Sequence, residues 1–597
     1  MRKHLLKFIK AHHVLMCLLL VIGTSCNKSP KVSTIVSEDN SLDGLNSAYS
    51  QEIEKSILAL DSLLLANDFN DKKAFYLKAR KSFKTVEPIL AFVDKENYKS
   101  LNAPNILKVE EEDATDIKIR EPFGFQVIEE NLFVENHDSI RLKNTIDQTI
   151  NRLKLIHQNS KLRLSDYHIL WLIRDEIIRI ALTGITGFDS PVLEESLIDA
   201  TISYQGMLLI LENYKSRFHS DEMYNKWIKE INNSINDLQN SSFNEFDRFS
   251  FIKNHTHHQL QLILDTKQDW NIDFPYELAF SNEVKSLFSK ETFNLNFFAD
   301  IVENDPYYES KVKLGKKLFN DVRLSSDGSM SCARCHQKDK AFTDGLKTFP
   351  TVNRNSPTLT YAALQQSFFM DGRAGNLEGQ IVGVVENPDE FHTDLKTLTV
   401  VIKSDSIYSK SFDSIYQEID DMSIRNAIAS YVRSLNKFNS KFDNNINGIE
   451  HSLSEQEING FNLFMGKAKC ATCHFAPVFN GTVPPNFTES EMELLGVPND
   501  TISNMVSVDL GRYNVFHTEE RKHFFKTPTI RNVSKTAPYM HNGVYQNLEQ
   551  VLDFYNNGGG VGLGIELEYQ TLPTDSLQLS KDEIRDIISF MKSLEDQ

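Results

Sequence analysis

The sequence contains few cysteines, no excess of basic residues and no apolar run long enough to cross a membrane. Its 597 residues include six Cys, and 82 Asp and Glu outnumber 64 Lys and Arg. Nucleic-acid binding needs a basic surface, so the acidic balance argues against that class of function. The apolar run at residues 14–25 has 12 residues, whereas a membrane-spanning helix needs about 20. These absences favour a folded protein that neither binds nucleic acid nor spans a membrane.

The N-terminus has the organisation of an export signal. The basic stretch MRKHLLKFIKAHH precedes the apolar run, which ends in GTSC at Cys26. This pattern resembles a bacterial lipoprotein signal and predicts a signal peptide at residues 1–26 with Cys26 lipidated, although a plain signal peptide or a signal anchor also fits. The polar residues that follow, 27–41, predict a flexible tether. We therefore expect the protein in the cell envelope or periplasm, anchored to a membrane by lipid.

Helical periodicity dominates residues 42–268. Ile53, Ile57 and Leu60 recur at spacings of three and four, which places them on one helical face. Alternating strand patterns and Asn-Gly hairpins are scarce in this region. We predict a helical bundle here, a linker at residues 269–305, and a mainly α fold for the whole chain.

One segment of the helical region resembles a known family. The stretch EPFGFQVIEENLF is similar to the imelysin-like helical domains of bacterial envelope proteins, whose hallmark is G-x-H-x-x-E. The matching residues here are Gly124, Gln126 and Glu129. Gln is a poorer metal ligand than His, so the resemblance implies the fold without the metal chemistry. A nearby stretch, KNHTHHQLQ, holds three histidines that either bind a metal or begin a solvated helix: His255, His257 and His258.

Two C-x-x-C-H motifs use every cysteine beyond the N-terminal segment. They comprise Cys332, Cys335 and His336, and Cys470, Cys473 and His474. A redox disulfide of this spacing belongs after a strand in a βαβ unit, and neither copy follows a β-rich run. Four thiolates could form one zinc site, but that leaves the paired histidines unexplained. Covalent haem c explains all three residues of each motif, since two thioethers fix the porphyrin edge and the His binds iron.

Each motif lies in a segment of about domain size. The stretches LGKKLFND and GFNLFMGKAKC precede the two motifs and resemble one another, which indicates a weak internal repeat. We predict a first haem c domain at residues 306–445 and a second at 446–597. The predicted architecture is therefore an N-terminal helical bundle followed by two cytochrome c-like haem domains.

From about residue 307 onward the sequence resembles the bacterial di-haem cytochrome c peroxidase family, including its MauG-type branch. The matching stretches are LGKKLFNDVRLSSDGSMSCARCH, DGRAGNLEGQ, ENPDEF, FKTPTIRNV, TAPYMHNG and VLDFYNNGG. The resemblance implies two covalently bound haem c groups. The first, on His336, would be the peroxide site, and the second, on His474, would transfer electrons. It also implies one Ca²⁺ between the haem domains.

The same resemblance assigns roles to residues outside the two motifs. Gln380 and Glu390 match the family's distal pair, in which Gln orients the peroxide and Glu moves a proton between its oxygens. Without that resemblance, a surface acid in the loop after Pro388 would be the favoured interpretation of Glu390, because Glu is a common residue. The predicted calcium contacts are Asn355, Thr536 and Pro538.

The sequence departs from the family pattern at three places. No His lies between His336 and His392, so we expect a catalytic haem without a distal His ligand. Tyr555 occupies the position of the usual Met ligand of the second haem, and Met540 is a rival candidate for that role. Met370 replaces the Trp that usually lies between the haems, which puts fast charge sharing in doubt.

The expected activity is the reduction of hydrogen peroxide to water by a cytochrome-c peroxidase-like oxidoreductase. Its electrons would come from a small redox protein such as a cytochrome c or a cupredoxin. One alternative is a MauG-type oxidase that acts on a partner protein. Another is a non-enzymatic envelope protein for electron transfer or iron handling, which would need both haems six-coordinate and would have no use for Glu390.

Overall fold

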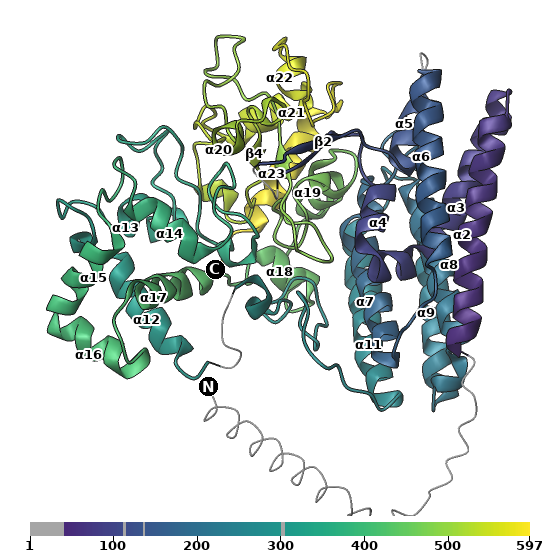
Figure 1. Cartoon of the computed structure of the whole chain (residues 1–597), viewed down its shortest axis with the longest axis horizontal. Helices are drawn as coiled ribbons and strands as arrows, with labels where there is room; N and C mark the ends of the chain where they lie inside the picture. The colour runs from purple at the N-terminus through teal and green to yellow at the C-terminus, as the bar shows by residue number, and fades with distance from the viewer. Residues whose placement is uncertain (1–40, 112–114, 135–137, 300–304) are drawn as a thin grey trace, which may run out of the picture. The chain divides into compact units, whose positions relative to one another are not determined.

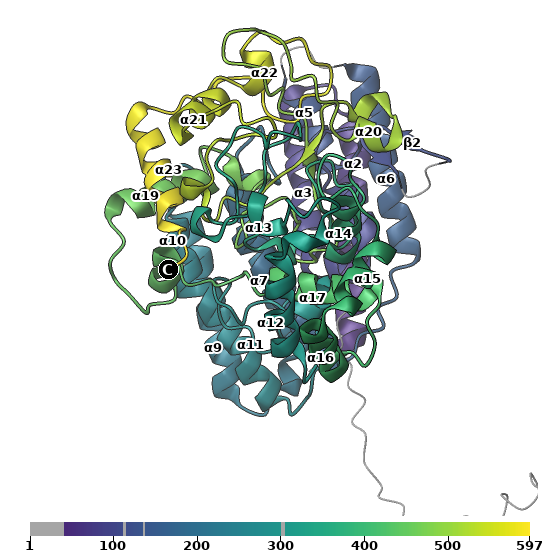
Figure 2. The same cartoon turned by 90° about the vertical axis from the view of Figure 1, so that its left-hand side faces the viewer.

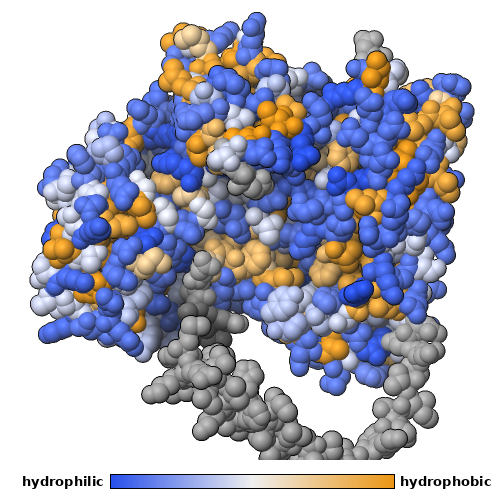
Figure 3. Space-filling view, viewed as in Figure 1, coloured by the Kyte–Doolittle hydropathy of each residue, from blue (hydrophilic) through white to orange (hydrophobic). Residues whose placement is uncertain are grey.

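The computed structural model describes residues 41–111, 115–134, 138–299 and 305–597. The predicted signal peptide, Cys26 and the predicted tether up to residue 40 lie outside these residues. Among the described helices, none is long and apolar enough to cross a membrane. The face drawn in Figure 3 is mainly hydrophilic, with apolar side chains in small separate groups, as is usual for a folded protein surface.

The first part of the chain folds into long helices that run side by side (Figure 1). Helix α3 packs against α7 and α8, and α8 packs against α9. Side-chain caps start several of them, as where the Asp68 carboxylate accepts hydrogen bonds from the first backbone amides of α3. The prediction of a mainly α fold is confirmed. The long helices are α2 (Ser41–Leu65), α3 (Phe69–Val93), α6 (Ser139–Gln158), α7 (Asp166–Leu182), α8 (Ser196–Asn213), α9 (Asp221–Gln239) and α11 (His257–Asp269).

Shorter elements connect these helices. Strands β1 and β2 pair antiparallel between α4 and α5. A π-helical turn at Ile252–Thr256 joins α10 to α11. The short elements are α4 (Lys95–Leu101), β1 (Lys108–Glu110), β2 (Lys118–Arg120), α5 (Phe125–Leu132) and α10 (Arg248–Phe251).

The segment after α11 contains little regular structure, and its phenylalanines pack inward. The rings of Phe280 and Phe293 stack with centroids 5.3 Å apart, and Phe293 meets Phe487 edge-on at 5.2 Å. Phe487 belongs to the predicted second haem domain, so the described part of this linker is fixed to it by aromatic contacts. The predicted boundaries at residues 269–305 remain predictions.

Helices again dominate the two segments that carry the C-x-x-C-H motifs. The first segment holds α12 (Tyr308–Phe319), α13 (Cys332–Cys335), α14 (Leu377–Val385), α15 (Leu395–Ser404), α16 (Ser406–Ile415) and α17 (Asp421–Arg433). The second holds α18 (Lys441–Ile446), α19 (Glu455–Met465), β3 (Met492–Glu493), α20 (Tyr513–Phe516), β4 (Phe525–Lys526), α21 (Leu548–Asn556), α22 (Gly559–Gly562) and α23 (Lys581–Ser593).

A glycine at a close helix crossing explains the resemblance between the leads of the two motifs. Helix α12 crosses α17 at Gly315, where an added Cβ would lie 1.8 Å from the carbonyl oxygen of Ala427. Helix α19 crosses α23 at Gly460, where a Cβ would lie 1.9 Å from the carbonyl oxygen of Asp586. Both crossings therefore require glycine, and each precedes a C-x-x-C-H motif.

Replacing Gly460 with Ala is expected to lower the free energy of unfolding by about 1–3 kcal/mol, because the new methyl group overlaps backbone and must push the helices apart. Urea unfolding followed by circular dichroism measures the change. Gly375→Ala is the matched control, since nothing lies within 4 Å of the added Cβ. Equal stability of the two variants would contradict the close-crossing explanation.

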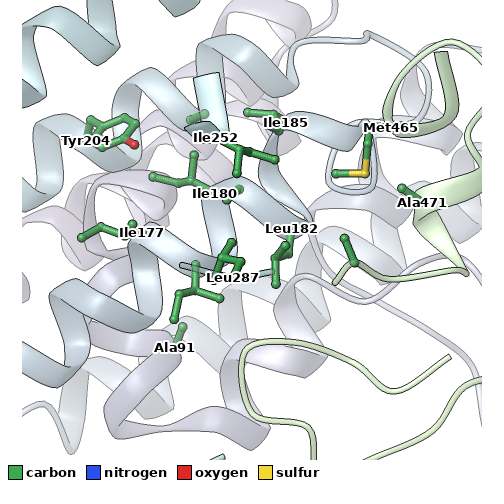
Figure 4. Packing of buried hydrophobic residues seen from close by; sticks show 14 of the residues in the cluster. Ala91, Ile177, Ile180, Leu182, Ile185, Tyr204, Ile252, Leu287, Met465 and Ala471 are labelled. Atoms are coloured by element: carbon green, nitrogen blue, oxygen red, sulfur yellow. The ribbon is translucent and has the colours of Figure 1, made fainter. Parts of the chain in front are cut away.

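The helical region packs against the second motif segment, next to its C-x-x-C-H motif. Ile180, Leu182 and Ile185 share one hydrophobic cluster with Met465 and Ala471 (Figure 4). Helices α10 and α19 also meet (Figure 2), where the backbone amide of Phe249 donates to the Asn462 side chain at 3.0 Å. The buried Arg248 guanidinium fills the space beside Gly466, where a Cβ would lie 2.6 Å from its central carbon. Residues Leu42–Gln597 accordingly cluster as one unit.

Candidate active site

The first C-x-x-C-H motif presents two free thiols and one available imidazole nitrogen. His336 uses Nδ1 on the Phe342 carbonyl oxygen at 3.0 Å, which leaves Nε2 for another partner. Burial lowers the pKa of His336 and therefore favours the neutral, metal-binding imidazole. Cys332 and Cys335 are unpaired, and burial raises the pKa of both thiols to about 12. Two free thiols and one free imidazole nitrogen are the protein groups that attachment of a haem c requires.

These three residues line a cavity of about 390 Å³. Much of its wall is apolar, from side chains of α12, α14, α15 and α17 and of the segments that connect these helices. Examples of this apolar wall are Phe319, Leu324, Phe368, Ile381, Leu398 and Ile428. An apolar cavity with two thiols and a free imidazole nitrogen on its wall has the chemistry that a covalently attached porphyrin requires.

The cavity also brings Gln380 and Glu390 to the first motif. Gln380 is carried by α14, which Asn376 caps by accepting from the Gly379 amide at 2.7 Å. Glu390 lies in the turn after α14 and is partly buried, so it is not an exposed surface acid. Burial raises the pKa of Glu390 to about 7, and the nearby Asp389 adds to this, while Asn387 and Arg373 oppose it. A carboxyl group with such a pKa can accept and release a proton near neutral pH.

Within the described residues that line this cavity, His336 is the only histidine. His392, the next histidine along the chain, is exposed. Met370 lies on the cavity wall beside Phe369, whose ring is covered by the Arg373 guanidinium at 3.5 Å.

The second motif repeats the arrangement of the first. His474 Nδ1 lies 3.0 Å from the Pro528 carbonyl oxygen and 3.2 Å from that of Phe479, so Nε2 is again left available. Burial lowers the pKa of His474 to about 4 and keeps the imidazole neutral. Cys470 and Cys473 are unpaired. The second motif therefore also presents two free thiols and one available imidazole nitrogen.

Comparison with known proteins decides the family. A family model described as di-haem cytochrome c peroxidase matches residues 309–451. The cytochrome-c peroxidase IdrP2 of Denitromonas iodatirespirans is 32% identical over 308 residues, covering 47% of this chain and 81% of that protein. The chain belongs to the di-haem cytochrome c peroxidase family. The methylamine utilization protein MauG of Methylorubrum extorquens is 30% identical over 300 residues, covering 49% of this chain and 79% of MauG.

Membership in the di-haem peroxidase family makes the chain a peroxidase-type oxidoreductase and implies two c-type haems. Among solved structures, a MauG-like protein associated with microbial copper homeostasis has 25% identity and a TM-score of 0.43, covering 50% of this chain and 92% of that one. The relatives match about half of this chain, so they say nothing of the remainder.

Tyr555 lies beside the second motif of this di-haem peroxidase. It belongs to α21 and is partly buried. Burial raises the pKa of its hydroxyl, and the neighbouring thiols of Cys473 and Cys470 raise it further. Met540 packs against the same small apolar cluster as Tyr555, a cluster that includes Phe554. Both predicted ligand candidates therefore lie in one region, and Tyr555 is near enough to Cys473 and Cys470 for their charge to affect its hydroxyl.

Two residues beside the haem motifs were not identified from the sequence. Glu493 on β3 hydrogen-bonds Cys473, and burial raises the pKa of its carboxyl to about 7. Lys526 on β4 lines the first cavity. The two strands pair antiparallel, with Met492 opposite Lys526 and Glu493 opposite Phe525. No local pattern reveals either residue, although Lys526 lies in the FKTPTIRNV stretch that carries the family resemblance.

The predicted calcium contacts come from two segments that the structure joins. The backbone amide of Asn355 donates to the His541 carbonyl oxygen at 2.8 Å, in the segment that also holds Thr536 and Pro538. The Asn355 side-chain nitrogen donates to the Leu346 carbonyl oxygen at 2.8 Å. The amide oxygen of Asn355 is therefore the atom available for a cation.

In the helical region, the residues of the G-x-Q-x-x-E stretch have structural partners. Glu129 is buried and accepts hydrogen bonds from the Tyr76 hydroxyl at 3.0 Å and the Ser190 hydroxyl at 3.0 Å. Gln126 donates to the Asn102 carbonyl oxygen at 2.7 Å. His255 and His258 both contact Glu230, at 2.7 and 3.0 Å. Within the described ranges, no three His, Cys, Asp or Glu side chains are arranged to hold a metal ion by themselves.

Proposed function

We propose that this protein reduces hydrogen peroxide to water at the first haem, using electrons that a small redox protein delivers to the second. The observation that carries this proposal is the single cavity that combines Cys332, Cys335 and His336 with Glu390, a proton-transfer group whose pKa is about 7. Gln380 lines the same cavity. A pure electron carrier has no need of such an acid at an open cavity.

Each residue has a definite part in the proposed reaction. Cys332 and Cys335 would hold the haem as thioethers and His336 Nε2 would bind its iron, so that the bound haem supplies the electrons that break the O–O bond. Gln380 orients hydrogen peroxide through its side-chain amide. The Glu390 carboxylate takes the proton from one peroxide oxygen and delivers it to the other, which leaves as water. Two protons from solvent convert the remaining oxygen to a second water, and two electrons from the donor protein restore those that the haem would supply.

The catalytic haem is proposed to be open, without a distal His. The support is that His336 is the only histidine among the described residues around the cavity and that His392 is exposed. An open site binds peroxide without prior reduction of the protein.

The holoprotein tests this function directly. Steady-state consumption of hydrogen peroxide with a reduced small cytochrome c, or with a reduced cupredoxin, is expected, and heat-denatured holoprotein is the control. A protein that carries two haems and consumes no peroxide with any such donor would contradict the proposal.

A MauG-type oxidase that draws electrons from a partner protein is the second candidate, and the position of Tyr555 favours it. We propose Tyr555 as the sixth ligand of the second haem. Replacing it with Met is expected to raise the reduction potential of that haem, since Met favours ferrous iron. An optical redox titration measures the shift, and Met540→Leu is the control. A shift in the Met540 variant alone would assign the ligand to Met540 instead.

We also propose a calcium ion held by Asn355, Thr536 and Pro538, supported by the hydrogen bond that joins Asn355 to the 536–541 segment.

The protein is proposed to reside in the cell envelope, attached to a membrane by lipid on Cys26. The basic and apolar pattern before Cys26 supports this location. An imelysin-like fold remains our proposal for the helical region.

A further inference from the structure

Lys526 is a partly buried cation on the wall of the first cavity, and the described residues give it no acidic partner. Its ammonium donates to the side-chain oxygen of Gln365. Burial lowers its pKa to about 8, and no neighbouring charge contributes. The other two cations that line the cavity are paired, because Arg354 and Arg373 contact Asp371 at 2.6 and 2.8 Å.

The main chain fixes this lysine at the cavity. Its backbone amide donates to the Met370 carbonyl oxygen at 2.7 Å, and Met370 itself lines the cavity. On the other side, Lys526 pairs with Met492 across the β3–β4 ladder. Lys526 is therefore held from both sides and differs from a lysine on a mobile surface loop.

An ammonium withdrawn from water is costly unless an anion compensates it. One hydrogen bond to the neutral Gln365 side chain replaces only part of its hydration. Any group that fills the cavity removes the remaining water from Lys526 and raises that cost. The Lys526 ammonium therefore needs an anion, and the molecule that occupies the cavity must supply that anion.

We propose that Lys526 binds a propionate of the first haem c. The cavity wall carries Cys332, Cys335 and His336, and the propionates are the only acidic groups that a haem c brings with it. This assignment rests on the proposed function, since it needs a haem on the first motif. The reduced haem carries one positive charge fewer than the oxidised haem. A fixed cation beside the haem therefore stabilises the reduced form and raises the reduction potential.

Optical redox titration of the holoprotein tests the assignment, with haem content measured by the pyridine haemochrome method. Lys526→Met is expected to keep two haems per chain and to shift the potential of the first haem to more negative values, while the second is unchanged. Lys526→Arg keeps the charge and should retain a potential close to that of the wild type. Lys522→Met is the matched control, because Lys522 contacts Glu519 at the surface and its loss is the same change in charge.

An unchanged first-haem potential in Lys526→Met, with both haems bound, would overturn the assignment and leave the proposed function intact. Equal shifts in the Met and Arg variants would also overturn it, because packing and not charge would then be responsible. If Lys526→Met does not fold, Lys526→Arg decides, since a potential far from that of the wild type contradicts the assignment. Wild-type protein without haem on the first motif would instead refute the proposed function.

Discussion

Replacing Glu390 with Gln is expected to lower the rate of hydrogen peroxide reduction by roughly 10²–10⁴-fold, the usual contribution of a positioned general acid–base group. The amide matches the carboxyl in size but cannot take a proton from one peroxide oxygen and pass it to the other. Steady-state peroxide consumption at pH 8 with a reduced small cytochrome c measures the effect, after haem content has been shown to be two per chain.

Asp389→Asn provides the matched control for that measurement. Asp389 precedes Glu390, lines the same cavity and is exposed. Its replacement removes one carboxylate beside the site without touching the proposed proton path, so a rate close to that of the wild type is expected. Wild-type activity in Glu390→Gln, or an equal loss in both variants, would remove Glu390 from the mechanism.

The second large effect is the loss of activity at low pH. The proposed first step needs the Glu390 carboxylate, and burial raises the pKa of that group to about 7. Its ionised fraction therefore rises with pH up to about neutrality and falls about tenfold for each pH unit below that. We expect kcat/KM for hydrogen peroxide to drop by roughly 100-fold between pH 8 and pH 5.

The Glu390→Gln variant shows whether that pH dependence belongs to Glu390. Its low residual activity should vary little between pH 5 and pH 8, because the titrating group is gone. A wild-type profile that is flat through pH 7, or a Gln variant that keeps the wild-type slope, would show that another group controls the rate.

The parts of this molecule that depend on local sequence were predictable. The C-x-x-C-H motifs are visible in the sequence itself, and the structure adds that both histidines use Nδ1 on backbone carbonyls, which leaves Nε2 available. The weak repeat before them has its cause in Gly315 and Gly460, two positions where helices cross too closely for a side chain. A glycine within an apolar helical pattern therefore indicates a close crossing of two helices at these positions.

Buried charge in the helical region was not predictable from periodicity. Helix α3 carries Arg80 and Lys84 on its buried face. Arg80 contacts Asp199 at 2.6 Å and Lys84 contacts Asp189 at 2.7 Å, both more than 100 residues along the chain. A one-dimensional pattern treats such residues as solvent-facing, because the partners that permit their burial are distant in sequence.

The same limit applies to the candidate site. Gln380 and Glu390 were found because a family motif marks them, whereas Lys526 and Glu493 are brought to the haem motifs by the β3–β4 pairing. The residues between β3 and β4 show no helical or strand periodicity, so the sequence does not predict that these two strands pair. The docking of Arg248 beside Gly466 likewise depends on the tertiary fold alone.

The ligands on both irons of the fully oxidised holoprotein test the central claim most directly. Electron paramagnetic resonance at low temperature distinguishes a high-spin ferric haem from a low-spin one. We predict one high-spin signal, from an open haem on His336, and one low-spin signal, from a six-coordinate haem on His474. Two low-spin signals, together with no change on addition of hydrogen peroxide, would contradict an open peroxide site facing Gln380 and Glu390.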